Sequence, residues 1–217
     1  MTEPDFQIAI VPVTPFQQNC SLLWNTATKQ ALVIDPGGDA QRILDAIAKF
    51  GLHVQAMLLT HGHLDHAGAA AELRETLRVP LIGPDIADKF LLDAIEENGE
   101  KFGIPGLRNV TPDRWLTDGE SLDLAGFRFL IRHCPGHSPG SVIFAEEERR
   151  FAFVGDVLFR GSVGRTDFPY GDGPALIAAI HANLLPLGDD IIFICGHGEA
   201  SSLGEERRSN PFLRGAA

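Results

Sequence analysis

The sequence contains little cysteine, few basic residues and no long apolar run. Three cysteines, at positions 20, 134 and 195, form neither a C-x-x-C pair nor a disulfide framework, which is typical of a reduced cytoplasmic protein. Eighteen Lys and Arg against 29 Asp and Glu give a net charge of −11, which argues against a broad nucleic-acid surface. The longest apolar stretches, such as Ile191–Cys195, are far shorter than the roughly 20 residues that span a bilayer.

The start of the sequence also lacks a targeting pattern. Residues 1–15 open with acidic side chains instead of a basic segment before a long apolar one, so we expect no signal peptide. Together with the composition, this predicts a cytoplasmic protein with neither a nucleic-acid nor a membrane partner, and no obligate protein partner is evident. Its expected partner is a small molecule.

Length and composition favour one globular domain. With 217 residues, of which 44% are hydrophobic and 23 are glycine, the chain can bury roughly 70% of its unfolded surface. No linker, low-complexity segment or repeat divides it. We therefore expect a single domain over residues 1–217.

Short apolar strands alternate with helices along the chain. Strands are predicted over residues 6–13, 20–24, 30–34, 54–59, 79–82, 141–145, 151–154 and 190–195, with a hairpin over 120–133. Asp39 can cap a helix that ends at Gly51. Further helices are predicted from the histidine-rich loop to about Arg78 and over 85–97, 174–185 and 203–208, whereas residues 98–113 are expected to form a long surface loop.

Four apolar strands run into loops that carry histidine or aspartate beside glycine. Such a loop with histidine follows Leu59, Ile131 and Ile194, and Gly155-Asp156 follows Val154. If the ends of these strands share one sheet edge, or two facing edges, the loop side chains converge in space.

The densest of these loops is Thr60–His66, with the sequence T-H-G-H-L-D-H. Neutral imidazole is the commonest metal ligand, and side chains at i and i+2 of an extended loop point the same way, so His61 and His63 can hold one ion. Asp65 and His66, just before a helix, can hold a neighbouring ion. Taken alone, Asp65 would be a helix N-cap and each histidine an ordinary loop residue. Five loop histidines with two aspartates instead favour a metal centre.

Four motifs in this order resemble those of the metallo-β-lactamase superfamily. They are Thr60–His66, Pro135-Gly136-His137, Gly155-Asp156 and Gly196-His197-Gly198. The resemblance covers nearly the whole chain. It implies an α/β (α+β) fold: a four-layer αββα sandwich of two mixed sheets with outer helices, and a metal site at one edge.

The resemblance also implies a ligand set for two divalent metal ions. His61, His63 and His137 would hold the first ion, Asp65, His66 and His197 the second, and Asp156 would bridge both. Zinc is the expected metal, with iron or manganese as alternatives, since imidazole and carboxylate suit all three. Cys134 and Cys195, although close to His137 and His197, are expected to be buried packing residues.

Further stretches narrow the resemblance to one branch. Gly155–Phe168, Pro12–Cys20, Asp35–Gly38 and Asn210–Phe212 are similar to the glyoxalase II branch, above all to its short bacterial hydroxyacylglutathione hydrolases. This implies hydrolysis of a glutathione thioester, such as S-lactoylglutathione, to a 2-hydroxy acid and glutathione by a metal-held hydroxide. Asp65 and Asp156 would be the catalytic residues. Since only residues 198–217 follow the last motif histidine, the glutathione-binding C-terminal helical extension of longer relatives is not expected.

Recognition of an anionic thioester by an acidic protein needs local cations. Arg165 is the first candidate and Arg160 the second, because arginine can grip a carboxylate with two hydrogen bonds. An ordinary salt bridge is the alternative for each. Tyr170, the one tyrosine of the chain, lies near the expected mouth, where substrate contact and loop packing are both open.

Two other functions stay open. One is a persulfide dioxygenase, which would hold a single iron with His61, His137 and Asp156, a two-histidine, one-carboxylate set. The other is a non-catalytic metal-binding module on the same fold, although such a module needs no bridging carboxylate.

Overall fold

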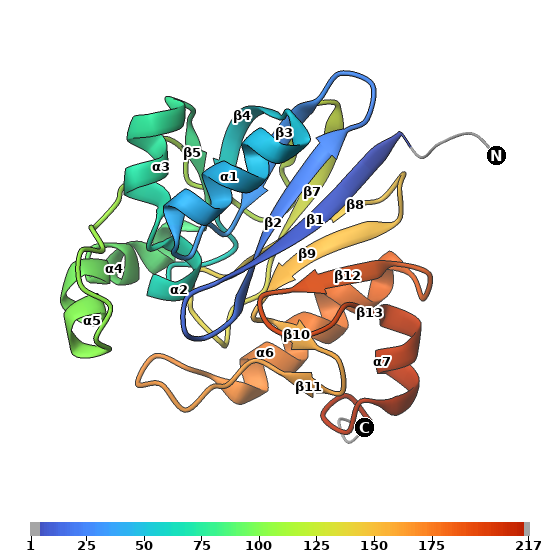
Figure 1. Cartoon of the computed structure of the whole chain (residues 1–217). Coiled ribbons are helices and arrows are strands. Elements are labelled where there is room, and N and C mark those ends of the chain that lie inside the picture. The colour runs from blue at the N-terminus through green and yellow to red at the C-terminus, as the bar shows by residue number, and fades with distance from the viewer. Residues whose placement is uncertain (1–4, 215–217) are drawn as a thin grey trace.

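Two mixed β-sheets pack face to face in the computed structural model, which describes residues 5–214 (Figure 1). Within these residues, the first sheet has the order β1 (Phe6–Val13), β2 (Gln18–Asn25), β3 (Gln30–Ile34), β4 (His53–Leu58) and β5 (Leu81–Ile82). The first three strands are antiparallel neighbours, whereas β3, β4 and β5 run parallel.

The second sheet follows in the chain and is largely antiparallel. Its order is β13 (Ser201–Ser202), β12 (Ile192–Cys195), β9 (Phe151–Gly155), β8 (Val142–Glu146), β7 (Phe127–His133) and β6 (Ser121–Leu124). Only the pair β12 and β9 is parallel among the strand pairs described. A small hairpin of β10 (Leu158–Phe159) and β11 (Ser162–Val163) lies outside both sheets.

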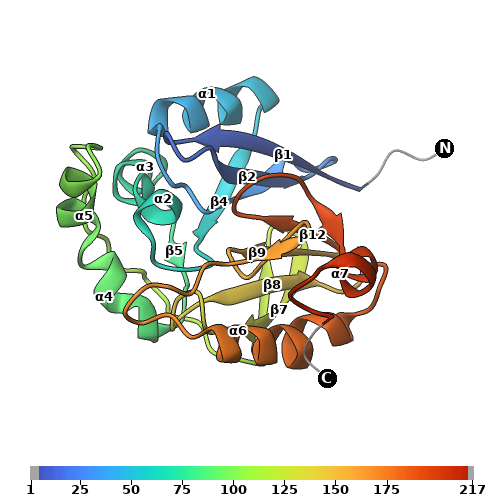
Figure 2. The same ribbon diagram turned by 90° about the horizontal axis from the view of Figure 1, so that it is seen from below.

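Helices cover the outer face of each sheet, as Figure 2 shows with α1 and α6 on opposite sides. The first sheet packs against α1 (Ala40–Phe50), α2 (Leu64–Ala67) and α3 (Ala70–Leu77). The second packs against α6 (Gly173–Ala179), a π-helical turn (Ile180–Leu184) and a 3-10 turn (Leu185–Leu187), with α7 (Leu203–Ser209) at its end. This arrangement confirms the four-layer αββα sandwich.

A third apolar cluster fills the space between the sheets. Phe129, Phe144 and Phe153 of the second sheet are fully buried there with Leu32 and Leu58 of the first. Truncating a buried phenylalanine to alanine typically costs about 3–5 kcal/mol, so this layer fixes how the two sheets face each other. Every residue of β8 and β9 is buried, as expected for strands with covered faces.

Several local predictions need correction. The helix predicted up to Arg78 is broken between α2 and α3, because the Ala69 amide donates to the Pro36 carbonyl. The expected loop over 98–113 begins late, since α5 (Ile95–Lys101) continues into it. Asp39 stands at the N-cap of α1 without capping it through its side chain, which accepts a hydrogen bond from the Thr14 amide instead.

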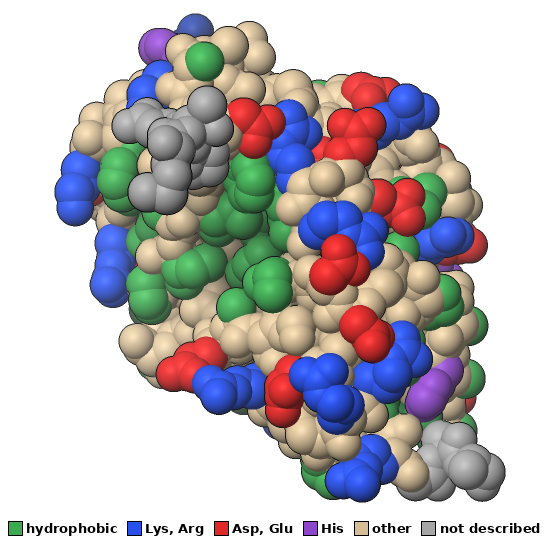
Figure 3. Space-filling model, turned by 90° about the vertical axis from the view of Figure 1, so that its right-hand side faces the viewer, with side chains coloured by type: hydrophobic (Ala, Val, Ile, Leu, Met, Phe, Trp, Pro, Cys, Tyr) green, Lys and Arg blue, Asp and Glu red, His purple; other side chains and the backbone are tan. Residues whose placement is uncertain are grey.

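The segment between β5 and β6 forms a separate helical region beside α2. The single helix predicted over 85–97 is wrong, because the structure divides it into a 3-10 turn (Ile86–Asp88), α4 (Lys89–Leu92) and α5, with Asp93 and Ala94 between the two helices (Figure 1). On the face in Figure 3, hydrophobic side chains gather beside interspersed acidic and basic ones, so that face carries no extended field of one sign. None of the helices in residues 5–214 has the length and hydropathy of a membrane span.

Candidate metal centre

The loops that leave β4, β7, β9 and β12 meet at one edge of the sandwich. They carry Thr60–His66, His137, Asp156 and His197, whose side chains lie within hydrogen-bond or ion-pair distance of one another. Because β4 belongs to the first sheet and the other three strands to the second, the site requires both sheets. The predicted convergence of the strand ends is confirmed.

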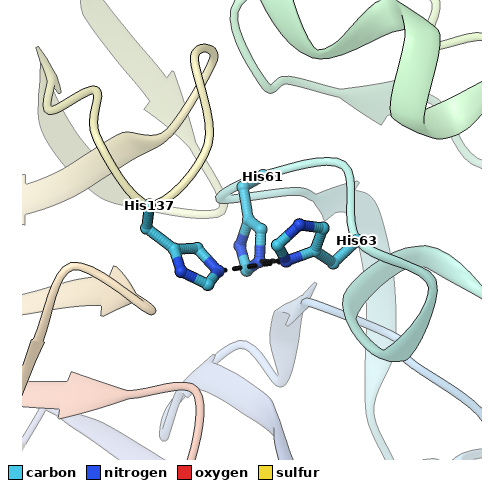
Figure 4. A group of neighbouring side chains, drawn as sticks. All are labelled: His61, His63 and His137. Atoms are coloured by element: carbon cyan, nitrogen blue, oxygen red, sulfur yellow. Dashed lines mark hydrogen bonds between the residues drawn. The ribbon is translucent and has the colours of Figure 1, made fainter. Parts of the chain in front are cut away.

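Three histidine side chains form the first group, with their rings pointing toward one another in Figure 4. Nδ1 of His63 lies 3.0 Å from Nε2 of His61 and 3.0 Å from Nε2 of His137. Burial and neighbouring histidines hold the pKa of His61 well below its usual value, and burial lowers the pKa of His63 to about 3. Burial also lowers the pKa of His137. Neutral rings leave nitrogen lone pairs free for a cation.

Asp65, His66 and His197 form a second group beside the first. Nε2 of His197 lies 3.2 Å from Oδ2 of Asp65. Asp65 belongs to the first turn of α2, whose N-cap position is taken by His63. Asp65 is therefore not the helix N-cap that it would be on its own.

Asp156 lies between the two groups. Its Oδ2 is 3.6 Å from Nε2 of His137 and 3.6 Å from Nε2 of His197, while Oδ1 is 3.3 Å from Nε2 of His66. Burial acts to raise the pKa of Asp156, but the charge of His66, whose Nε2 faces Oδ1, and the charge of His197 outweigh it and hold this pKa below its usual range. An ionised carboxylate thus separates two sets of ring nitrogens.

Two buried atoms of this cluster lack a hydrogen-bond partner within residues 5–214. They are Nε2 of His66 and Oδ1 of Asp156. They face each other at 3.3 Å, an ion-pair distance, and a divalent cation between them would give both atoms a ligand bond. The donor set, imidazole nitrogens with carboxylate oxygens, suits divalent transition metals.

Asp35, which the sequence indicated only within the family-like stretch Asp35–Gly38 and not as a site residue, orients His66 from the side opposite the metal groups. Its Oδ2 lies 2.9 Å from Nδ1 of His66 and accepts the Thr60 hydroxyl at 2.7 Å, while Oδ1 accepts the Thr60 amide. A carboxylate on the far nitrogen of a ligating histidine fixes its tautomer and leaves the other nitrogen free. Its position at the end of β3, followed by Pro36 and two glycines, was the available signal.

The substrate-binding candidates lie at the exposed margin. Arg165 pairs with Asp167 and lies over the Phe168 ring, and its backbone carbonyl accepts a hydrogen bond from Nδ1 of His137 at 2.9 Å. Arg160 pairs with Glu199. Cys134 and Cys195 are buried, as expected, and neither belongs to a metal-binding group of the described chain.

The family model of the metallo-β-lactamase superfamily matches residues 13–197. The chain belongs to the metallo-β-lactamase superfamily. This membership agrees with the order of the motifs and with the sandwich fold. Together with the two groups of histidine and aspartate side chains, it indicates divalent metal ions at this edge.

Relatives within the superfamily cover nearly the whole chain. Hydroxyacylglutathione hydrolase GloC of Haemophilus influenzae is 52% identical over 207 residues, 95% of this chain and 97% of the relative. The crystal structure of TTHA1623 in a di-iron-bound form is 38% identical, with a TM-score of 0.84 over 94% of this chain and 100% of that one. The BLEG-1 B3 metallo-β-lactamase structure is 37% identical, with a TM-score of 0.89 over 96% and 100%.

Proposed function

We propose that this protein hydrolyses a glutathione thioester, a hydroxyacylglutathione such as S-lactoylglutathione, to a 2-hydroxy acid and glutathione. The observation that best supports a two-metal hydrolase is the position of Asp156. Its two oxygens face ring nitrogens of both the three-histidine group and the group of Asp65, His66 and His197. The substrate class is supported by the 52% identity to a hydroxyacylglutathione hydrolase.

We assign the ligands of two divalent ions, zinc in preference to iron or manganese. His61, His63 and His137 would hold the first, Asp65, His66 and His197 the second, and Asp156 both. A relative 38% identical that was crystallised in a di-iron-bound form supports a centre with room for two ions. When bound, the ions would supply an activated water and an acceptor for the negative charge of the carbonyl oxygen.

The chain's own side chains prepare the site for this reaction. Asp65 stands beside His197 and is partly exposed, so its carboxylate can orient the attacking water. Asp156 is ionised and can bind both ions at once. The leaving thiolate has an ordinary thiol pKa near 8.5, so its departure demands no general acid.

We propose Arg165, and secondarily Arg160, as anchors for the substrate carboxylates. Arg165 lines a cavity of about 300 Å³ together with Thr166, Leu176 and Phe212. The same loop holds His137 through the Arg165 carbonyl, whereas the lining of the cavity includes none of the proposed metal ligands. The ion pair of Arg165 with Asp167 is exposed on both sides and weak enough to be exchanged for a substrate carboxylate.

Two further assignments belong to this proposal. We place the activity in the cytoplasm, where the three buried, unpaired cysteines would stay reduced. We treat residues 1–217 as one catalytic domain, because the proposed ligands come from both sheets and neither sheet can build the site alone.

A metal count combined with three substrates tests the proposal. We expect two metal equivalents per chain and release of free thiol from S-lactoylglutathione. Glutathione persulfide in an oxygen electrode tests the dioxygenase alternative, and a cephalosporin tests β-lactam hydrolysis. Oxygen uptake with a single iron and no thioester cleavage would overturn the hydrolase assignment. Metal binding without turnover of any of these would favour a non-catalytic module.

A further inference from the structure

Asp88 is a fully buried carboxylate outside both metal-binding groups. It ends the 3-10 turn before α4 and has no exposed surface. No Lys or Arg of residues 5–214 forms an ion pair with it. A buried charge without a countercharge is costly unless several hydrogen bonds hold it, so its position calls for an explanation.

The hydrogen bonds of Asp88 join the two loops that carry the three histidines. Its Oδ2 accepts the Gly62 amide at 2.8 Å, and Gly62 stands between His61 and His63. The same oxygen accepts the Ser138 hydroxyl at 2.7 Å, and Ser138 follows His137 directly. Oδ1 accepts the Gly140 amide at 2.5 Å. One carboxylate therefore ties together segments that are 76 positions apart, from residue 62 to residue 138.

The loops can approach this carboxylate closely because glycines, which lack a side chain, stand at the points of contact. A Cβ on Gly140 would lie 2.7 Å from the Asp88 carboxyl carbon and 2.6 Å from its amide nitrogen. A Cβ on Gly62 would lie 3.0 Å from the Asp88 carbonyl oxygen. Because both loops approach Asp88 by their backbones, the two loops are held at a fixed separation.

We propose that Asp88 is the positioning residue of the three-histidine group, a carboxylate clamp that sets the distance between the His61–His63 loop and the His137 loop. The inference rests on the proposed metal centre. Asp88 touches none of the three rings, so it acts through the backbone of Gly62 and through Ser138 and Gly140.

The ionised carboxylate offers an acceptor to each of the three donors. Two N–H groups and one hydroxyl converge on two acceptor oxygens. An asparagine would turn an NH₂ group toward at least one of these donors and lose that hydrogen bond. Hence Asp88→Asn keeps the size of the side chain and breaks the clamp.

The test measures metal affinity in a background that isolates the group. In a His197→Ala chain, which retains His61, His63 and His137, Zn²⁺ affinity is measured by competition with a chromophoric chelator, with and without Asp88→Asn. We expect an affinity loss of at least about tenfold, as is typical when an orienting partner of a metal ligand is removed. The visible spectrum of bound Co²⁺ is expected to change as well.

Two variants separate a clamp from general stability. Asp85→Asn removes a charge from the same turn, where Asp85 caps the Ala87 amide, and should leave Zn²⁺ affinity within twofold. If Asp88→Asn does not unfold cooperatively, Ser138→Ala replaces it, with an expected loss of threefold or more. Unchanged affinity and Co²⁺ spectrum, with only a lower melting temperature, would overturn the clamp. Failure of the unaltered chain to bind Zn²⁺ would overturn the metal centre itself, and the clamp with it.

Discussion

The hydroxyl of Tyr170 lies 2.8 Å from Nε2 of His63, while Nδ1 of the same ring faces His61 and His137. For Nδ1 to present a lone pair to an ion, Nε2 must carry the proton and donate it to the tyrosine oxygen. Burial raises the pKa of Tyr170 to about 12, so its hydroxyl stays neutral. Tyr170 therefore orients a proposed metal ligand, and the loop-packing alternative is also satisfied by its stacking on Phe168.

Tyr170→Phe removes this hydroxyl and keeps the aromatic stack. We expect metal affinity to fall by about tenfold, because His63 loses the partner that fixes its tautomer. Chelator competition measures the change. Ser162→Ala, which removes a hydroxyl in β11 that bonds only the Val163 carbonyl, should have no such effect. Equal affinities for wild type and Tyr170→Phe would contradict the orienting role.

Asp156→Ala should remove the link between the two groups. Without the shared carboxylate, we expect occupancy of the Asp65, His66 and His197 group to be lost and turnover to fall by at least about a hundredfold. Elemental analysis and a thioester assay measure both. Asp45→Ala, an exposed carboxylate on α1 bonded to Gln41, is the control. Full activity of Asp156→Ala would refute the bridging assignment.

Gly196→Ala should disable the site through steric overlap alone. A Cβ at this position would lie 2.1 Å from Oδ1 of Asp156 and 2.4 Å from Cε1 of His66, so one of these side chains must move. We expect metal content and activity to be lost together. Gly198→Ala is the control from the same loop, since a Cβ there meets nothing within 4 Å and the strain of its positive φ costs only about 1 kcal/mol of stability. A fully active Gly196→Ala variant would contradict this packing.

The sequence predicted the metal-binding loops because chemistry and periodicity agreed there. His61, His137, Asp156 and His197 each follow a short apolar strand beside glycine, and strands that share a sandwich bring their ends to the same edge. Motif order then indicated the family, and the family indicated the layers. None of this depended on long-range contacts between side chains.

The supporting carboxylates could not be predicted in the same way. Asp35 lies 25 positions from Thr60, and Asp88 lies 50 positions from Ser138. In the sequence, one is a residue of a strand break and the other an acid inside a helical segment. Their roles arise from packing between loops, where the surrounding N–H and hydroxyl groups donate hydrogen bonds to a buried carboxylate. Single-sequence patterns carry no record of such partners.

Arg165→Ala tests substrate recognition. If this side chain grips a substrate carboxylate, its loss removes a charged hydrogen bond worth about 1.5–3 kcal/mol, and we expect KM for S-lactoylglutathione to rise at least tenfold with little change in kcat. Arg160→Ala, which breaks a comparable exposed ion pair, should raise KM less. An unaltered KM in both variants would show that the two arginines form surface salt bridges and do not bind the substrate.

Stability should depend on pH through Asp88. Burial raises the pKa of Asp88 to about 6, although hydrogen bonds from Ser138, Gly62 and Gly140 act in the opposite direction. An aspartate in an unfolded chain titrates near 3.9. The folded protein therefore holds this proton more tightly, and the resulting stabilisation is complete below about pH 4 and disappears as the pH rises through 6. The difference between the folded and unfolded pKa values corresponds to a loss of roughly 3 kcal/mol, at 1.36 kcal/mol per pKa unit.

Urea unfolding of the metal-free protein between pH 4 and pH 7 measures this dependence. Other groups of the protein also change their protonation with pH, so the informative quantity is the difference between wild type and Asp88→Asn, from which their contribution cancels. We expect the wild type to lose stability relative to the variant by about 2–3 kcal/mol across this range, most of it between pH 4 and pH 6. A constant difference would show that Asp88 is ionised throughout, with its three hydrogen bonds outweighing its burial.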